Sequence, residues 1–179
     1  MEGIKTMTEK DIQLLKAIGN TGIITSDLLS QYKINRKRLY QHIISKNIEK
    51  KGNFLIFGTL KTVYTLTREG KAYLRNNFQI NPYKSDFTQL EHDYVLARIY
   101  SFLPFECKNS WQNETKLKQL YDTATTTDGM FKNGSQNICV EVVTDAYTKD
   151  MVDSKKEFIR HFADNYIMIH THKDIEYEI

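Results

Sequence analysis

Residues 26–67 read SDLLSQYKINRKRLYQHIISKNIEKKGNFLIFGTLKTVYTLT, and this stretch decides the expected fold of the first half of the chain. Its opening predicts a short helix over residues 27–32 that buries two leucines. Asn35 is a residue type that caps helix starts, and it predicts a second helix over residues 36–46. Two β-rich runs then predict a hairpin, with strands over residues 48–57 and 62–67 joined by residues 58–61.

The segments on either side of this stretch add one helix each. Thr8 and the acidic residues after it form a helix start signal, and apolar residues recur at helical spacing until residues 19–22 end the pattern. Thr67 is the expected cap of a further helix over residues 68–78. Three helices, a hairpin and a helix are typical of a winged helix-turn-helix, so we expect residues 1–78 to form a DNA-binding domain.

The charge of the chain is divided unevenly between its two halves. Residues 1–78 contain 14 Lys and Arg against 6 Asp and Glu, a formal charge of +8. Residues 79–179 contain 11 Lys and Arg against 16 Asp and Glu, a formal charge of −5. The overall charge of +3 therefore hides a basic first half, which predicts a polyanionic partner there, and an acidic second half that is a poor nucleic-acid surface.

The predicted helix over residues 36–46 is the candidate for the major groove of double-stranded DNA, because its N-terminal side chains would reach base edges. Arg36 and Gln41 are the expected base contacts, since Arg pairs with guanine and Gln with adenine in a bidentate way. Tyr40 is a further candidate that could instead pack against the hairpin. A solvated charged helix face is the alternative interpretation. The expected phosphate contacts are Lys33, Lys37, Arg38, Lys50, Lys51 and Lys61.

Residues 79–89 contain Pro82 and show no periodicity, which predicts a linker between two domains. Residues 90–179 are expected to form a small α/β domain that provides dimer or partner contacts, so the fold class of the whole chain is α+β. Its elements follow an αβββαβ order. They are a helix over residues 90–103, strands over residues 105–114, near 128–131 and over 136–144, a helix over residues 149–162 and a strand over residues 165–170.

Three acidic residues, Glu114, Asp128 and Glu141, fall at the ends or in the middle of these strands. Close carboxylates at such positions can hold Mg²⁺. The arrangement resembles the PD-(D/E)xK nuclease core, with Asp128 at its first acidic position and Glu141 at its second. Val143 occupies the place of the lysine in that motif, so we expect no catalytic activity unless Lys155 or Lys156 replaces it. The alternative is an ordinary α/β domain with acids at its rim.

The chain as a whole resembles the replication-relaxation family. The resemblance rests on the winged helix, then Leu90-Glu91-His92-Asp93, Trp111 with Glu114, Asp128-Gly129 and Val140-Glu141-Val142 before a lysine-bearing helix. These are accessory proteins of Gram-positive plasmids and integrative elements. The resemblance implies a winged helix joined to a degenerate nuclease-like domain, and binding to the DNA of a mobile element near an origin of replication or conjugative transfer.

Other features narrow the expected chemistry. Cys107 and Cys139 lack metal-ligand spacing, and His170 and His172 lack an evident third ligand, so no metal and no cofactor is expected outside the Mg²⁺-dependent nuclease alternative. No apolar run is long enough to cross a bilayer and residues 1–8 do not form a secretory signal, which predicts a cytoplasmic protein without a membrane partner.

The expected function is sequence-specific binding of double-stranded DNA in plasmid replication, mobilisation or its regulation. The expected partners are DNA, a second copy of the chain, since two half-sites multiply specificity, and other replication or transfer proteins. A transcriptional repressor or copy-number regulator is an alternative that needs the same groove contacts. An Mg²⁺-dependent DNA nuclease is the other.

Overall fold

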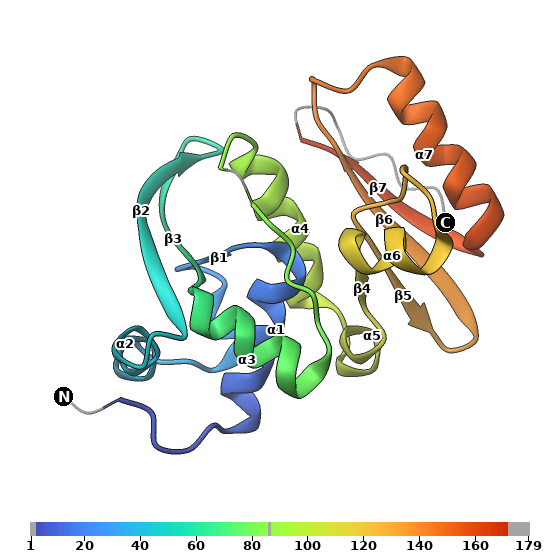
Figure 1. The fold of residues 1–179 in the computed structure, drawn as a ribbon. Coiled ribbons are helices and arrows are strands. Elements are labelled where there is room, and N and C mark those ends of the chain that lie inside the picture. The colour runs from blue at the N-terminus through green and yellow to red at the C-terminus, as the bar shows by residue number, and fades with distance from the viewer. Residues whose placement is uncertain (1–2, 86, 172–179) are drawn as a thin grey trace. The chain divides into compact units, whose positions relative to one another are not determined.

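The computed structural model describes residues 3–85 and 87–171, and within them the fold is a mixed α+β arrangement with two small sheets (Figure 1). The chain divides into two compact units, Met1–Phe102 and Leu103–Ile179, which are described separately below. None of the helices in the described part of the chain has the length and apolarity needed to cross a membrane.

The helices of the first unit are α1 (Glu9–Thr21), the 3₁₀ helix η1 (Leu29–Tyr32), α2 (Arg36–Ile44), α3 (Arg68–Phe78) and α4 (Leu90–Phe102). Helices α1, α2 and α3 begin where the sequence supplies a capping side chain, whereas Leu28 before the 3₁₀ helix makes no such bond. Thr8 and Asp11 form a capping box at the start of α1, in which each side chain bonds to the other residue's backbone amide. The side chains of Asn35 and Thr67 accept hydrogen bonds from the first turns of α2 and α3, so both helices start at the predicted residues.

The first sheet has the order β1-β3-β2 and is antiparallel, with β1 (Ile24–Thr25), β2 (Ile48–Ile56) and β3 (Thr59–Leu66). Strand β3 starts earlier than predicted, because Phe57 and Gly58 turn the chain within two residues. Both have positive φ, 46° and 69°, the backbone conformation that tight hairpin turns require. A bulge between Lys50 and Gly52 interrupts the pairing of β2 with β3.

Helix α4 belongs to the first unit, although the sequence predicted it as the start of the second domain. Its side chains bond to α1, to η1 and to the turn between β1 and η1. Tyr100 Oη accepts from Asn20 Nδ2 at 3.3 Å, Ser101 Oγ and Tyr32 Oη lie 2.8 Å apart, and Tyr94 Oη donates to Asp27 Oδ2 at 2.9 Å. The expected boundary at residues 79–89 therefore moves to Phe102, because the apolar face of α4 packs into the core of the first unit.

The second unit contains α5 (Phe105–Asn109), β4 (Gln112–Asn113), α6 (Glu114–Tyr121), β5 (Gly129–Asn133), β6 (Gln136–Val143), α7 (Lys149–Phe162) and β7 (Asn165–His170). Its sheet has the order β4-β5-β6-β7, with β6 and β7 parallel and the other pairs antiparallel. Helices α6 and α7 contribute to one apolar cluster with the sheet, formed by Leu117, Met130, Cys139, Val143, Phe158, Ile159 and Met168.

The predicted strand over residues 105–114 is wrong. Pro104 precedes helix α5, and Asn113 caps α6, so only the two residues of β4 remain extended between two helices. Trp111 lies just before β4 and packs against Gly129, where a Cβ atom would come within 2.2 Å of the indole ring. The glycine at the start of β5 thus makes room for the indole.

Candidate functional site

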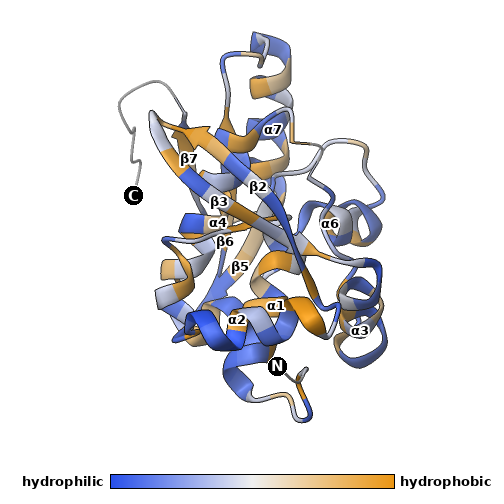
Figure 2. Cartoon of the chain, turned by 90° about the vertical axis from the view of Figure 1, so that its left-hand side faces the viewer, coloured by the Kyte–Doolittle hydropathy of each residue, from blue (hydrophilic) through white to orange (hydrophobic). Residues whose placement is uncertain are grey.

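Helix α2 presents a basic face to solvent. Arg36 and Lys37 are exposed, and so are Tyr40 and Ile44 at the positions that follow on the same side of the helix. Gln41 lies at the margin of this face and is half-buried. Figure 2 shows most of α2 in the hydrophilic colour, in contrast to the hydrophobic stretch of α1. The predicted base contacts Arg36 and Gln41 and the candidate Tyr40 therefore share one region of the helix surface.

Three further predicted phosphate contacts are also exposed. Lys33 adopts a left-handed conformation, with φ 53°, in the turn between η1 and α2. Lys50 and Lys51 lie at the bulge of β2, where Lys51 Nζ is 2.7 Å from Glu49 Oε1. An exposed pair of this kind holds its lysine only weakly, so both side chains remain accessible to an anion.

Lys61, which the sequence predicted as a phosphate contact, is mostly covered by its neighbours. It lies on β3, and its Nζ is 2.8 Å from Asp27 Oδ2 and 4.8 Å from the centre of the Tyr94 ring. Only 14% of its side chain is exposed. The hydrogen bond to Asp27 raises the pKa of Lys61. The ion pair with Asp27 thus partly neutralises Lys61 at the surface, so Lys61 is less available to a phosphate than the exposed cations of α2.

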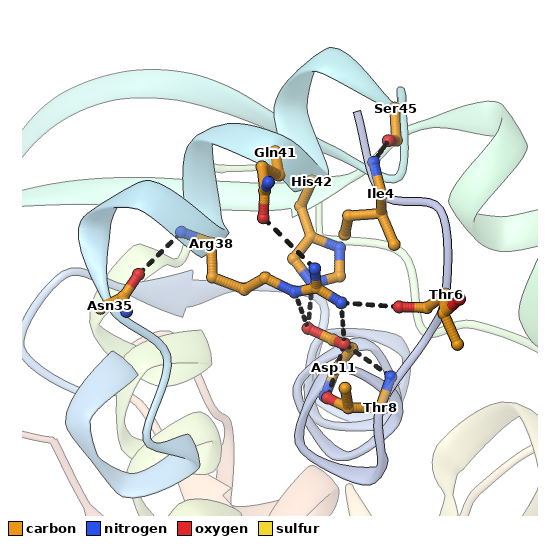
Figure 3. A network of polar contacts seen from close by, with 9 residues as sticks. All are labelled: Ile4, Thr6, Thr8, Asp11, Asn35, Arg38, Gln41, His42 and Ser45. Atoms are coloured by element: carbon orange, nitrogen blue, oxygen red, sulfur yellow. Dashed lines mark hydrogen bonds and ion pairs between the residues drawn. The ribbon is translucent and has the colours of Figure 1, made fainter. Parts of the chain in front are cut away.

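Arg38 also differs from its prediction as a phosphate contact. It reaches across to the N-terminus of α1, where Asp11 is completely buried (Figure 3). Arg38 Nε donates to Asp11 Oδ1 at 2.8 Å, and Arg38 Nη2 donates to Asp11 Oδ2 at 2.5 Å and to the carbonyl oxygen of Thr6 at 2.8 Å. A bidentate pair with a buried carboxylate is strong and directional, so the contact between Arg38 and Asp11 stabilises the packing of α2 against α1.

His42 completes this group, which we call the Asp11 cluster (Asp11, Arg38 and His42). Its ring is fully buried, and its Nε2 lies 2.9 Å from Asp11 Oδ1. Burial lowers the pKa of His42 although Asp11 opposes the shift. Burial works to raise the pKa of Asp11, but hydrogen bonds from Arg38, Thr8 and His42 outweigh it and hold that pKa well below its usual range. A neutral His42 therefore donates its Nε2 proton to an ionised Asp11.

The second unit buries a different acidic group, the Glu141 cluster (Asp128, Glu141 and Lys155). Glu141 lies in β6 on the side that faces α7, and its Oε1 and Oε2 lie 3.0 and 3.2 Å from Lys155 Nζ. The backbone amide of Asp128 donates to Glu141 Oε2 at 3.1 Å, and Asp128 Oδ2 accepts from the Val142 amide at 2.7 Å. Of the two lysines proposed from the sequence, Lys155 is buried in this cluster and Lys156 is exposed.

A hollow of about 370 Å³ borders Lys155 of this cluster and is also lined by Glu114, Thr126, Tyr147, Ser154 and their neighbours. Glu114 is the first residue of α6 and not the end of a strand; its Oε1 is 2.8 Å from Lys118 Nζ. Burial and the negative charges of Glu141 and Asp128 raise the pKa of Tyr147. Burial alone would lower the pKa of Lys155, but Glu141, Asp128 and Glu114 raise it, so Lys155 stays charged.

Several residues that form or contact these sites were not predicted from the sequence. Asp11 carried a signal, because an acid three residues after Thr8 indicates a capping box, but nothing in the pattern indicated its pairing with Arg38. Tyr147 and Asp27 lie in segments without a motif. Within the described residues, no three His, Cys, Asp or Glu side chains form a metal-binding group. His170 lies in β7, whereas His172 lies outside the described residues.

The candidate sites are the basic face of α2 and the Glu141 cluster, and both are described from the residues of this chain alone. Comparison of the sequence and the structure with protein-family models, with curated proteins and with solved structures finds no match.

Proposed function

We propose that the chain is a sequence-specific double-stranded DNA-binding protein whose first unit is a winged helix-turn-helix. The observation that carries the proposal is the exposed basic face of α2, formed by Arg36, Lys37 and Tyr40. The opposite side of the same helix buries Leu39 and His42 against the unit. A helix anchored on one side and basic on the other can enter the major groove without losing its support.

The surrounding elements support this proposal. The 3₁₀ helix η1 and the turn at Lys33 lead into α2 as the first helix and turn of a helix-turn-helix do, and the β2–β3 hairpin follows as the wing. Residues 1–102 contain 16 Lys and Arg against 9 Asp and Glu, a formal charge of +7. Such an excess attracts DNA over the whole unit, while the side chains on α2 discriminate between bases.

The test is an unbiased selection of bound duplexes at a stated salt concentration, followed by affinity measurements. Arg36→Ala should lower the affinity for the selected site by about 1–3 kcal/mol, because a bidentate contact to guanine would be lost. Lys50→Ala should weaken binding to every sequence and reduce the salt dependence. Lys61→Ala is the matched control with a small effect, since Lys61 already pairs with Asp27. Failure of the wild type to enrich any sequence would contradict the proposal.

We further propose that the bound DNA belongs to a mobile element, where the protein acts in replication, mobilisation or their regulation as a homodimer with other replication or transfer proteins. This proposal rests on the family resemblance of the sequence. A selected site with two half-sites would support the dimer. A site inside a promoter, with repression of that promoter in a reporter strain, would favour the transcriptional regulator instead of the replication accessory.

A metal-dependent nuclease is a second candidate, and one observation favours it: Lys155 of α7 reaches Glu141, so a lysine lies beside the acids despite Val143. The acids as they stand do not suit a metal, because Asp128 and Glu141 accept hydrogen bonds from backbone amides and Lys155, and the described residues hold no three-ligand group. Incubation of plasmid DNA with the chain and Mg²⁺ tests this candidate. Cleavage that disappears in Glu141→Gln and Lys155→Met, but persists in Lys156→Met, would establish it.

A further inference from the structure

The guanidinium of Arg38 does more than pair with Asp11. Its Nη1 donates to the side-chain oxygen Oε1 of Gln41 at 3.2 Å, on the same helix (Figure 3). Arg38 can only donate hydrogen bonds, so the oxygen of the Gln41 carboxamide must face it and the NH₂ group must face away. Among the described residues, none accepts a hydrogen bond from that NH₂ group.

Asp11 holds the Arg38 guanidinium in the position from which it bonds to Gln41. The carboxylate takes Nε and Nη2 of Arg38 together, and the carbonyl oxygen of Thr6 takes a further hydrogen of Nη2. Planar bidentate pairing leaves the guanidinium little freedom to rotate. The position of Nη1, and with it the orientation of the Gln41 carboxamide, is therefore set by a carboxylate that is completely buried.

We propose that Asp11 and Arg38 are positioning residues that determine the base preference of Gln41, an inference that rests on the proposed DNA-binding function. Gln41 lies at the margin of the exposed face of α2 and offers an N–H donor there. A donor matches base atoms that accept in the major groove, which are N7 and O6 of guanine, N7 of adenine and O4 of thymine. It does not match cytosine, whose edge presents a donor. The base opposite Gln41 is thus a purine or thymine.

The decisive variant is Arg38→Lys, which keeps the positive charge and a partner for Asp11 but loses the planar group that holds Gln41. Selected duplexes and their affinities are compared for the full chain, Arg38→Lys, Gln41→Ala and the double variant. We expect Gln41→Ala to reduce discrimination at one base position by about 2- to 10-fold, the range of a single hydrogen bond. Arg38→Lys should relax the same position, and the double variant should add nothing to either single change.

Lys37→Met is the matched control on the neighbouring residue of the same helix. It should weaken all duplexes alike and lower the salt slope by about one, as loss of a phosphate contact does, without relaxing any base position. An unchanged base preference in Arg38→Lys, additive effects in the double variant, or a cytosine preference at the Gln41 position would each overturn the proposal.

A measurement without DNA separates this inference from the proposed function. The side-chain NH₂ resonances of Gln41 in the free protein should shift in Arg38→Lys and in Asp11→Asn, and remain unchanged in Lys37→Met. If these resonances shift and no duplex is enriched by the wild type, the DNA-binding proposal fails while the positioning of Gln41 stands. If the resonances do not move in either variant, the positioning itself is wrong.

Discussion

The two units each bury an acid with a basic partner, but they support it in different ways. Asp11 lies in the first turn of α1, where free backbone amides and the helix dipole favour a negative charge, and it holds two side chains of α2. Glu141 lies within strand β6, and its carboxylate contacts Lys155 of α7, the backbone amide of Asp128 and the hydroxyl of Tyr147. The first acid joins two helices beside an exposed face, whereas the second joins a helix to the interior of a sheet.

This difference predicts which unit tolerates the loss of a partner better. Removal of one member of a buried ion pair leaves the other charge without compensation. Arg38 has 25% of its side chain exposed, so water can compensate part of the loss in the Asp11 cluster. Each cluster has a fully buried acid, but only 11% of the Lys155 side chain is exposed, so less water reaches the basic partner in the Glu141 cluster. The Glu141 cluster should therefore be the more sensitive of the two.

Lys155→Ala should have the largest effect, lowering the free energy of unfolding of the second unit by about 3–5 kcal/mol, because Glu141 would remain buried and charged. The single tryptophan of the chain, Trp111, is buried in this unit, so its fluorescence during denaturant unfolding measures the change. Lys156→Ala removes an exposed lysine from the next position and should change the free energy by no more than about 0.5 kcal/mol. Equal effects of the two substitutions would show that the cluster does not stabilise the unit.

Asp11→Ala should lower the stability of the first unit by a smaller amount, about 2–3 kcal/mol, since it removes a helix cap as well as charge-assisted hydrogen bonds. Hydrogen exchange resolved by peptide is the suitable measurement, because it follows α1 and α2 separately from the second unit. Glu9→Ala changes an exposed acid in the same turn of α1 and serves as the control. Faster exchange in α1 without faster exchange in α2 would contradict the role of Asp11 in joining the helices.

Acidification should weaken the first unit through the same cluster. The folded-state pKa of Asp11 lies below its unfolded value, so its contribution is complete above about pH 4 and is lost as the pH falls toward the folded pKa. The lowered pKa of His42 acts in the same direction below about pH 6.5, because the unfolded chain takes up the proton first. Exchange of α2 amides between pH 7 and 3 should reveal both steps. Asp11→Asn should remove the lower one and His42→Gln the upper one; a pH profile unchanged by both variants would refute the assignment.

The sequence predicted the helix starts of the first unit well and the start of the second unit poorly, because only some of these features are encoded by local signals. Caps and hydrophobic periodicity are local, and they placed the starts of α2 and α3 at Arg36 and Arg68 and the bounds of α7 and β7 correctly. The strand expected over residues 105–114 was wrong because Pro104 and Asn113 each start a helix that the apolar pattern alone did not indicate.

Long-range pairing was less accessible than local structure. Arg38 and Lys61 carry the same charge as Arg36 and Lys50, so the sequence cannot distinguish them. The fold shows that Arg38 pairs with Asp11 and that Lys61 pairs with Asp27. Lys155 was a candidate because α7 was expected next to the acids, and the structure distinguishes it from Lys156 by burial. The sequence thus predicted the basic surface of the first unit in outline. Which of its cations are exposed and which form ion pairs could be seen only from the tertiary contacts.

The smallest effect should come from an exposed pair in the same unit as Lys155. Lys118 Nζ lies 2.8 Å from Glu114 Oε1 one turn away on α6, a shorter distance than either contact between Lys155 and Glu141. Water and salt screen this pair because 43% of the Lys118 side chain is exposed, so Lys118→Ala should cost no more than about 0.5 kcal/mol. Trp111 fluorescence measures it under the conditions used for Lys155→Ala. A loss comparable to that of Lys155→Ala would mean that distance, and not burial, decides the strength of the pairs in this protein.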